Sequence, residues 1–133
     1  MTAPAAAEPH MRAIGAALVA AGLSVGVGEA PSTDPPHVVV YADPGLTEGS
    51  LGRPYDTVVI TVQITAVGVG AEQAVQQADL ARAVLLTVPA PAVPGRYIHP
   101  LWVLDAQPVR RDDQVRPALF VATAQYRMRS DPA

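Results

Sequence analysis

Few side chains of this sequence have the chemistry of a catalytic or metal site, and their spacing matches no known catalytic pattern. The serines lack the Gly-x-Ser-x-Gly elbow that presents a nucleophile, and no pair of histidines has the HExxH spacing of a zinc site. Cysteine is absent, which excludes disulfides, thiol nucleophiles and thiolate metal sites together. The hydroxyl and imidazole side chains considered are Ser24, Ser32, Ser50, Ser130, His10, His37 and His99. We therefore expect neither a metal site nor a covalent nucleophile.

Phosphate-binding loops and paired carboxylates are the other common sources of chemistry. Segment 22–28 has regularly spaced glycines but lacks the dinucleotide fingerprint, and the chain has no lysine to complete a nucleotide-binding loop. The acidic residues fall mainly in expected loops and turns, where solubility explains them without an acid–base role. These carboxylates are Asp43, Glu48, Asp56, Asp112 and Asp113. The sequence therefore predicts a protein that is not an enzyme and that needs no cofactor.

Length and charge narrow the function classes further. At 133 residues the chain has room for one domain with a modest core. Its net charge of -3 disfavours a protein that grips nucleic-acid phosphates, because such binding normally needs a basic excess. The apolar stretch at 13–27 is interrupted by glycines and is shorter than the roughly twenty apolar residues of a membrane span. We expect a soluble protein made in a cytoplasm.

The elements that would position a functional surface follow from the apolar periodicity. Apolar residues at three- and four-residue intervals predict a helix over about 9–21 and a second over about 71–88. Residues 37–41 form a β-branched run, and residues 57–67 alternate between two faces, so both segments are expected to be strands. A short strand is also expected at 23–27.

Two more strands are expected near the end of the chain, over 97–107 and 120–129. The order of helix, strands, helix and strands predicts an α+β fold, a two-layer sandwich with two helices on one face of a mixed or antiparallel sheet. We expect residues 9–129 to form this single domain, with a flexible N-terminal tail at 1–8 and a C-terminal tail at 130–133.

Two exposed segments are the best candidates for contacts with other proteins. Residues 46–56 are mostly small or polar, so we expect an extended loop or arm rather than a packed element. This arm carries arginine and tyrosine, which contribute strongly to protein interfaces. The second segment is a mixed-charge turn at 110–113, expected at a hairpin tip. The candidate contact residues are Leu51, Arg53, Tyr55, Asp56, Arg110, Arg111, Asp112 and Asp113.

Five stretches of the chain occur in a distinctive order and spacing. They are Tyr41-Ala-Asp-Pro-Gly45, then Leu51-Gly-Arg-Pro-Tyr-Asp56 leading into the alternating run to Gly68, then Glu72-Gln73-Ala74, Pro108-Val-Arg-Arg-Asp-Asp113 and Ala118-Leu-Phe120. This succession resembles the tail terminator proteins of long-tailed, siphovirus-type phages of actinobacteria. The resemblance covers about residues 12–129 and rests on order and spacing, since no stretch is a catalytic signature.

The resemblance implies a structural role. Proteins of that family are small α+β domains that form a hexameric ring at the head-proximal end of the tail tube, stop its polymerisation and provide the head–tail joining surface. The implied protein is therefore a bacteriophage virion component, assembled in the host cytoplasm. Its partners would be copies of itself, the tail tube protein and a head-completion or neck protein. Genome DNA would pass through the ring without specific binding, and no membrane would be involved.

Two alternatives remain open from the sequence. A neck or head-closure protein of the same virion would have a similar size and ring habit, but would close the head portal instead of capping the tail. A small enzyme or ligand-binding domain would need a deep pocket with convergent polar groups.

Overall fold

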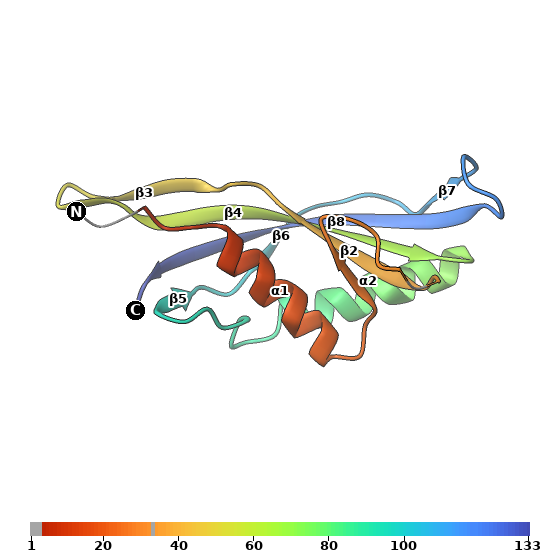
Figure 1. Ribbon diagram of the computed structural model, residues 1–133, viewed down its shortest axis with the longest axis horizontal. Helices are drawn as coiled ribbons and strands as arrows, with labels where there is room; N and C mark the ends of the chain where they lie inside the picture. The colour runs from red at the N-terminus through yellow and green to blue at the C-terminus, as the bar shows by residue number, and fades with distance from the viewer. Residues whose placement is uncertain (1–3, 33) are drawn as a thin grey trace.

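Two long antiparallel strands, β4 (Arg53–Gly68) and β8 (Leu119–Pro132), form the centre of the sheet in the computed structural model, which describes residues 4–32 and 34–133. Their paired residues run from Val58 opposite Ser130 to Gly68 opposite Phe120. This pair gives the molecule an elongated shape (Figure 1).

Shorter strands lie along both outer edges of the central pair. β2 (His37–Ala42) pairs antiparallel with β4, and β1 (Val25–Val27) pairs parallel with β2. β3 (Leu46–Ser50) pairs with the first part of β4. Along the other edge, three strands pair antiparallel with β8: β5 (Arg96–Ile98), β6 (Trp102–Ala106) and β7 (Arg110–Asp112). The result is an eight-stranded mixed sheet.

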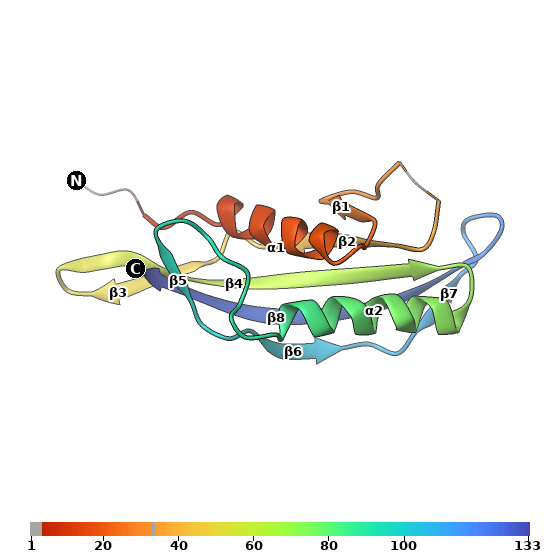
Figure 2. The ribbon, with the colours of Figure 1, turned by 90° about the horizontal axis from the view of Figure 1, so that it is seen from below.

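Both helices, α1 (Glu8–Ala20) and α2 (Ala71–Leu85), cover the same face of this sheet (Figures 1 and 2). Pro9 lies in the first turn of α1, where its missing N–H costs no hydrogen bond. Glu72 lies in the first turn of α2, near the positive end of the helix dipole. The predicted fold class, a two-layer α+β sandwich, is confirmed.

The core lies between the helices and the sheet, and the alternation of β4 builds it. Every second side chain of β4 from Val58 to Ala66 is buried, while the residues between them face away from the helices. Ile14 and Leu18 of α1 and Leu85 of α2 are fully buried in the same cluster. Burying an aliphatic side chain of this size contributes about 1.5–3 kcal/mol.

The segment at 46–56 projects as the expected exposed arm, but it is an antiparallel hairpin of β3 and the start of β4, a strand pairing that was not predicted. The prediction relied on the scarcity of apolar side chains, whereas a hairpin is held by backbone hydrogen bonds that require none. Its exposure is as expected, since every residue of β3 is exposed. Because β3 is paired with β4 but wholly exposed, the hairpin extends the sheet beyond the core.

Three other boundaries differ from expectation. α2 ends at Leu85 rather than near Val88; Pro89 disfavours helical conformation at Val88, and the helix stops with Leu86 as its C-cap. The single strand expected at 97–107 is interrupted between β5 and β6, where Pro100 has no N–H for a ladder. The predicted turn at 110–113 is mostly strand β7, and the connection to β8 follows it at 113–118.

The segments expected to be tails carry ordered contacts in the part of the chain that the structure describes. The expected N-terminal tail falls partly outside the described residues, at 1–3, but the Ala5 N–H donates to the Tyr55 carbonyl at 3.0 Å. At the other end, β8 continues through Pro132, because β5 pairs with its last residues. Ala5 and the last residues of β8 therefore lie close to the base of the β3–β4 hairpin.

Candidate interaction surfaces

The β3–β4 hairpin projects from one end of the molecule (Figure 1). Gly45 directly precedes β3 and has a φ of +81°. This left-handed value is the one required at the second central position of a type II turn. The Asp43 carboxylate accepts hydrogen bonds from the Gly45 and Thr61 N–H groups, at 3.0 and 3.1 Å. A Cβ added at Gly49 would lie 1.9 Å from the Arg53 carbonyl oxygen, so the strands approach too closely there for any other residue. Local sequence thus fixes the hairpin.

Four of the predicted contact residues share this hairpin. Leu51, at its turn, is fully exposed, and the Tyr55 side chain is also exposed. Arg53 Nε lies 3.3 Å from Asp56 Oδ2 in an ion pair whose arginine is largely open to solvent. The hairpin therefore presents a tyrosine and an arginine, two residue types that are enriched at the centres of protein interfaces, close to an exposed leucine.

The other four predicted residues lie on the β7–β8 hairpin at the opposite end of the molecule (Figure 1). Arg111 Nε lies 2.5 Å from Asp113 Oδ1. Asp112 Oδ1 accepts a hydrogen bond from the Gln114 N–H at 3.0 Å, which shapes the turn. The two predicted segments consequently form separate surfaces and not a single site.

A buried polar cluster at the base of the β3–β4 hairpin was not predicted; we call His10, Arg96 and Ser130 the terminal clasp. His10 Nδ1 donates to the Ala6 carbonyl at 2.8 Å, so His10 Nε2 is free to accept from the Ser130 hydroxyl at 2.7 Å. Arg96 Nε donates to Ser130 Oγ at 2.9 Å. The same guanidinium donates to the carbonyls of Asp56 and Ser130 at 2.6 and 2.8 Å. The clasp joins α1, β4, β5 and β8.

A second polar group adjoins the clasp around Asp131. Its Oδ1 accepts from the Thr57 hydroxyl at 2.5 Å, and its Oδ2 lies 2.6 Å from His99 Nε2 and 3.6 Å from Arg129 Nε. Arg129 Nη1 in turn lies 2.7 Å from Glu48 Oε1 on β3. The hydrogen bonds from Thr57 and His99 lower the Asp131 pKa below its ordinary value. These contacts tie the hairpin to the end of β8.

Burial lowers the pKa of two histidines. The pKa of His10 is lowered chiefly by burial, with the nearby Arg96 charge acting in the same direction and the Ala6 hydrogen bond opposing it. Burial likewise lowers the pKa of His37, whose Nδ1 is buried without a hydrogen-bond partner in the described structure. Both residues were predicted from sequence only as isolated histidines.

The contact of His10 with Ser130 has the separation of a base and a nucleophile, but Ser130 is fully buried. No substrate atom can reach a hydroxyl in that position, so in this arrangement the pair holds the fold together. The contact could not be seen in the sequence, because its two residues are 120 positions apart.

Among the described residues, no three histidine, cysteine or acidic side chains come together as a metal site. None of the helices in this part of the chain is long and apolar enough to cross a membrane.

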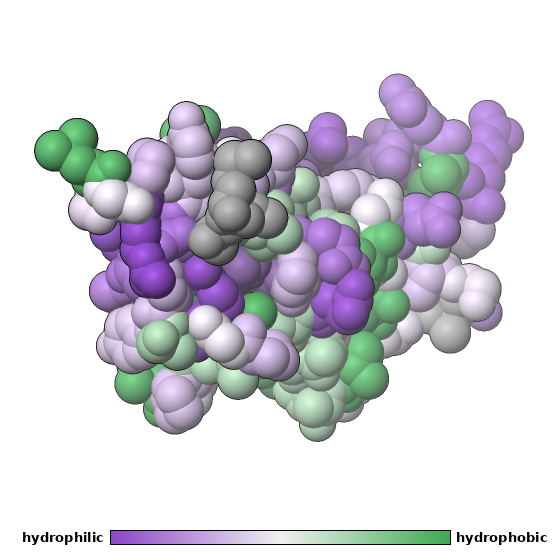
Figure 3. All heavy atoms as spheres, turned by 60° about the vertical axis from the view of Figure 1, so that its left-hand side comes forward, coloured by the Kyte–Doolittle hydropathy of each residue, from purple (hydrophilic) through white to green (hydrophobic). Residues whose placement is uncertain are grey.

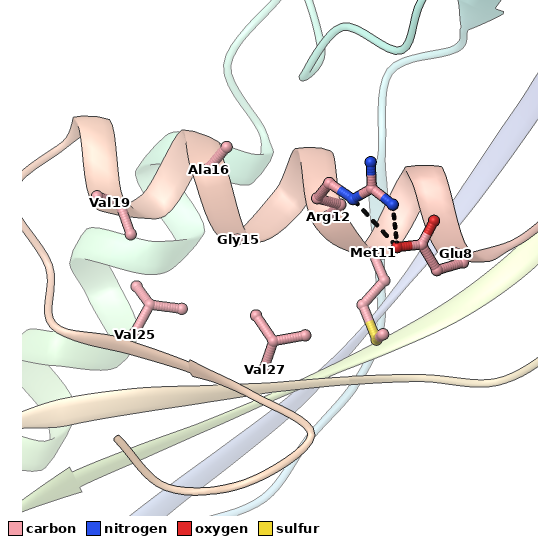
Figure 4. A pocket seen from close by; sticks show the side chains of 8 residues that line it. All are labelled: Glu8, Met11, Arg12, Gly15, Ala16, Val19, Val25 and Val27. Carbon is pink, nitrogen blue, oxygen red and sulfur yellow. Dashed lines mark hydrogen bonds and ion pairs between the residues drawn. The ribbon is translucent and has the colours of Figure 1, made fainter. Parts of the chain in front are cut away.

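A groove of about 330 Å³ lies between α1 and β1 (Figure 4). Met11 and Val19 of α1 and Val25 and Val27 of β1 line it, and Gly15 lets the strand approach the helix. Among the described residues that line it, the charged side chains are Glu8 and Arg12, and these two are paired with each other. The groove therefore lacks the convergent polar groups that orient a small ligand.

The face of the sheet opposite the helices is polar along its centre. Arg127 Nη2 lies 3.5 Å from Thr61 Oγ1, and Gln125 Nε2 lies 3.5 Å from Gln63 Oε1, so side chains of β4 and β8 meet in cross-strand pairs. At the end of the molecule that carries the β3–β4 hairpin, the surface is mainly polar with small, separate apolar patches (Figure 3). Large exposed apolar side chains occur on the β3–β4 hairpin, at Leu51 and Tyr55, and along the edges of the sheet, at positions such as Tyr41, Leu46 and Trp102.

The architecture that these surfaces share is a two-layer α+β domain with an extended central strand pair. No protein-family model matches the sequence, and no curated protein matches it. Among solved structures, the fold is similar to that of a chain in the virion of a native gene transfer agent particle, with a TM-score of 0.64 and 17% sequence identity. The match covers 91% of this chain and 93% of that one. At this identity, the similarity establishes a common fold over nearly the whole of both chains.

Proposed function

We propose that this chain is a structural protein of a virion, and specifically a tail terminator that caps the head-proximal end of a tail tube. The observation that carries the proposal is the fold shared with a virion chain over almost the full length of both. The order of sequence stretches from Tyr41 to Phe120, which resembles tail terminators of siphovirus-type phages, supports the finer assignment.

The proposed activity is steric, and it uses the two hairpins. In a ring of identical subunits, preferably a hexamer, hairpins at opposite ends of the molecule can reach different neighbours. We assign Leu51, Arg53, Tyr55 and Asp56 to one such contact, and the Arg110–Asp113 segment to another. One face of the ring would match the growing end of the tube, and the other would present a surface that the next tube ring cannot use but a head-completion protein can.

The charge of the chain suits a ring through which genome DNA passes. A net charge of -3 and the absence of lysine disfavour tight phosphate binding, which would retard sliding DNA. The subunit would therefore act at the head–tail junction without specific contacts to DNA.

The experiment is to assemble tail tubes from purified tube protein with and without this chain and to measure their lengths by electron microscopy. A terminator binds one tube end and halts growth, so tubes should become shorter as its concentration rises. In particles, loss of the chain should give overlong, headless tubes. Heads that leak DNA beside tails of normal length would instead support a neck or head-closure protein, and tubes whose length ignores the chain would refute the terminator.

A further inference from the structure

One edge of the sheet exposes an unusual run of large apolar side chains. Trp102, Val103 and Leu104 of β6 are 45%, 37% and 45% exposed. β6 pairs with β8 on one side only, and no described strand pairs with its other side. Edge strands are normally protected by lysine, proline, charges or bulges; β6 has no lysine or proline, and its one charge, Asp105, and its register shift come after Val103, so Trp102 and Val103 lie before them. This edge has the composition of an interface.

The opposite edge of the sheet also exposes apolar side chains. Tyr41 and Leu46 are 42% and 75% exposed. β1 pairs with β2 only as far as Val40, so the outer side of Tyr41 and Ala42 has no strand against it in the described structure. The two apolar edges therefore belong to different strands on opposite sides of the central pair.

The strand registers place Tyr41 and Trp102 at nearly the same position along the length of the central strands. Tyr41 lies opposite Gln63 of β4. Trp102 lies opposite Arg127, which itself lies opposite Thr61 of β4. Tyr41 and Trp102 are thus two residues apart along β4, and both are on the face of the sheet away from the helices, because the alternate positions of β4 are the buried ones. Copies of the chain set side by side would bring these two aromatic side chains together.

Strand direction and charge agree with that arrangement. β2 and β6 run in opposite directions, since both β2 and β8 are antiparallel to β4 and β6 is antiparallel to β8. Contact between β6 and the β2 side of a second copy would therefore continue the antiparallel order. The β1–β3 edge belongs to segment 13–52, which contains no arginine or lysine and has four acidic side chains: Glu29, Asp34, Asp43 and Glu48. Glu48 already pairs with Arg129 of the same chain, so Glu29, Asp34 and Asp43 are the acidic groups without an ion pair among the described residues.

The β6–β7 edge carries the positive charge of Arg110 at the position along the sheet where β2 begins on the opposite edge. Arg110 of β7 is exposed and makes no ion pair with a described carboxylate. Its partner Val121 lies opposite Val67, which lies opposite His37 at the start of β2. Asp34, exposed and without an ion pair among the described residues, precedes His37 by three positions. In adjacent copies, an arginine on one edge would face the acidic edge of the next.

We propose that the β6 edge of one copy of this chain binds the Tyr41–Leu46 edge of a second copy. Because the contact joins two different patches, it is heterologous, and repeating it through a closing rotation makes a ring. The inference rests on the proposed ring-forming function and adds the lateral interface to it. The exposed residues at the tip of the β3–β4 hairpin, Leu51, Arg53 and Tyr55, then remain available for axial contacts.

The test uses cysteine pairs, which are unambiguous because the chain has no native cysteine. Tyr41→Cys and Trp102→Cys are made singly and together and are oxidised, and the products are separated on denaturing gels. Within one chain the two positions are separated by three strand spacings, roughly 14 Å, which is too far for a disulfide. Every disulfide is therefore intermolecular.

The expected result is a cross-linked dimer when the two single variants are mixed, and a ladder ending at a fixed size for the double variant. Cross-linking of Trp102→Cys alone at the same yield would indicate a symmetric contact and overturn the proposal, as would absence of cross-links in the mixture.

A surface substitution provides an independent readout. Leu104→Lys should lower the oligomer fraction at least about tenfold, as expected when a charge is placed in a contact centre. Leu80→Lys, on an exposed position of α2, is the matched control and should leave the oligomer unchanged. Circular dichroism checks that both variants fold.

The failures of the two proposals are distinguishable. A cross-linked ring that leaves tube length unchanged would refute the terminator function but support the proposed interface between copies. Tube capping by a chain that forms no Tyr41–Trp102 cross-link would refute the interface but keep the terminator.

Discussion

The Ser130 hydroxyl lies 2.7 Å from His10 Nε2, so the last strand is fastened to the first helix. Arg96 donates to the same hydroxyl, which brings β5 into the contact. The three side chains are held at the base of the β3–β4 hairpin, and both His10 and Ser130 are buried. The stability of this end of the molecule should therefore depend on a few polar atoms.

Ser130→Ala should lower the free energy of unfolding by about 1–3 kcal/mol, because it leaves His10 Nε2 and Arg96 Nε without their partner in a buried setting. Urea titration followed by circular dichroism measures the change. Ser32→Ala, at an exposed position, is the control and should change stability by less than about 0.5 kcal/mol. Equal effects of the two substitutions would show that the terminal clasp does not contribute to the free energy of unfolding.

Stability should fall as the solution becomes acidic below about pH 6.5, the ordinary pKa of histidine. The folded protein holds the pKa of His10 and of His37 below that value, so the unfolded chain binds more protons in this range and is favoured. Asp131, whose pKa is lowered, adds a further loss below about pH 4, where the unfolded carboxyl takes up a proton first.

Denaturant titrations at about pH 7.5 and about pH 5 test the histidine effect. The unfolding free energy of the parent chain should be lower at the acidic pH, and His10→Gln should reduce that difference. A parent chain that is equally stable at both values would contradict the lowered pKa of the buried histidines.

Two glycines of one hairpin should respond differently to alanine. Gly49→Ala would place a Cβ 1.9 Å from the Arg53 carbonyl oxygen and should open the hairpin, whereas a Cβ at Gly52 meets no atom within 4 Å. Amide hydrogen exchange should rise across 46–56 in the Gly49 variant and stay near the parent value in the Gly52 variant. The core should stay protected in both, since β3 is wholly exposed.

The double substitution Arg53→Ala, Tyr55→Ala should leave the domain folded and weaken ring or tube association at least about tenfold, the effect of losing more than about 1.4 kcal/mol at a contact centre. Its effect on unfolding should be small, because the Arg53 and Tyr55 side chains are largely exposed. Sedimentation and tube-binding assays measure association, with Val88→Ala, an exposed apolar position outside both hairpins, as the control. Unchanged association would exclude the hairpin from the interface.

Periodicity predicted the parts of the fold that local burial controls. The alternation around Ile60 and the helical spacing of Ile14 and Leu18 correctly indicated a sheet covered by helices, because those patterns directly record which side faces the core. It could not predict the β3–β4 hairpin, whose strands are held by backbone pairing outside the core.

The clasp could not be predicted either. His10, Arg96 and Ser130 are far apart in sequence, and each residue alone is typical of an ordinary helix start or strand. Their contact depends on the register of β5 on β8 and on the position of α1, which are set by the whole fold. The exposure of the two segments that carry the predicted contact residues could be predicted, since glycine, proline and polar residues mark exposed turns. Their role as contacts stays a prediction.

The continuous pairing of β4 with β8 has a mechanical consequence. Each hairpin enters the pair through the first residues of one of these strands, at opposite ends of the molecule. A tensile load applied between the hairpins would pull the two antiparallel strands along their length, so the hydrogen bonds from Val58–Ser130 to Gly68–Phe120 would be strained together in shear rather than opened one after another. The subunit should therefore resist extension between its two ends.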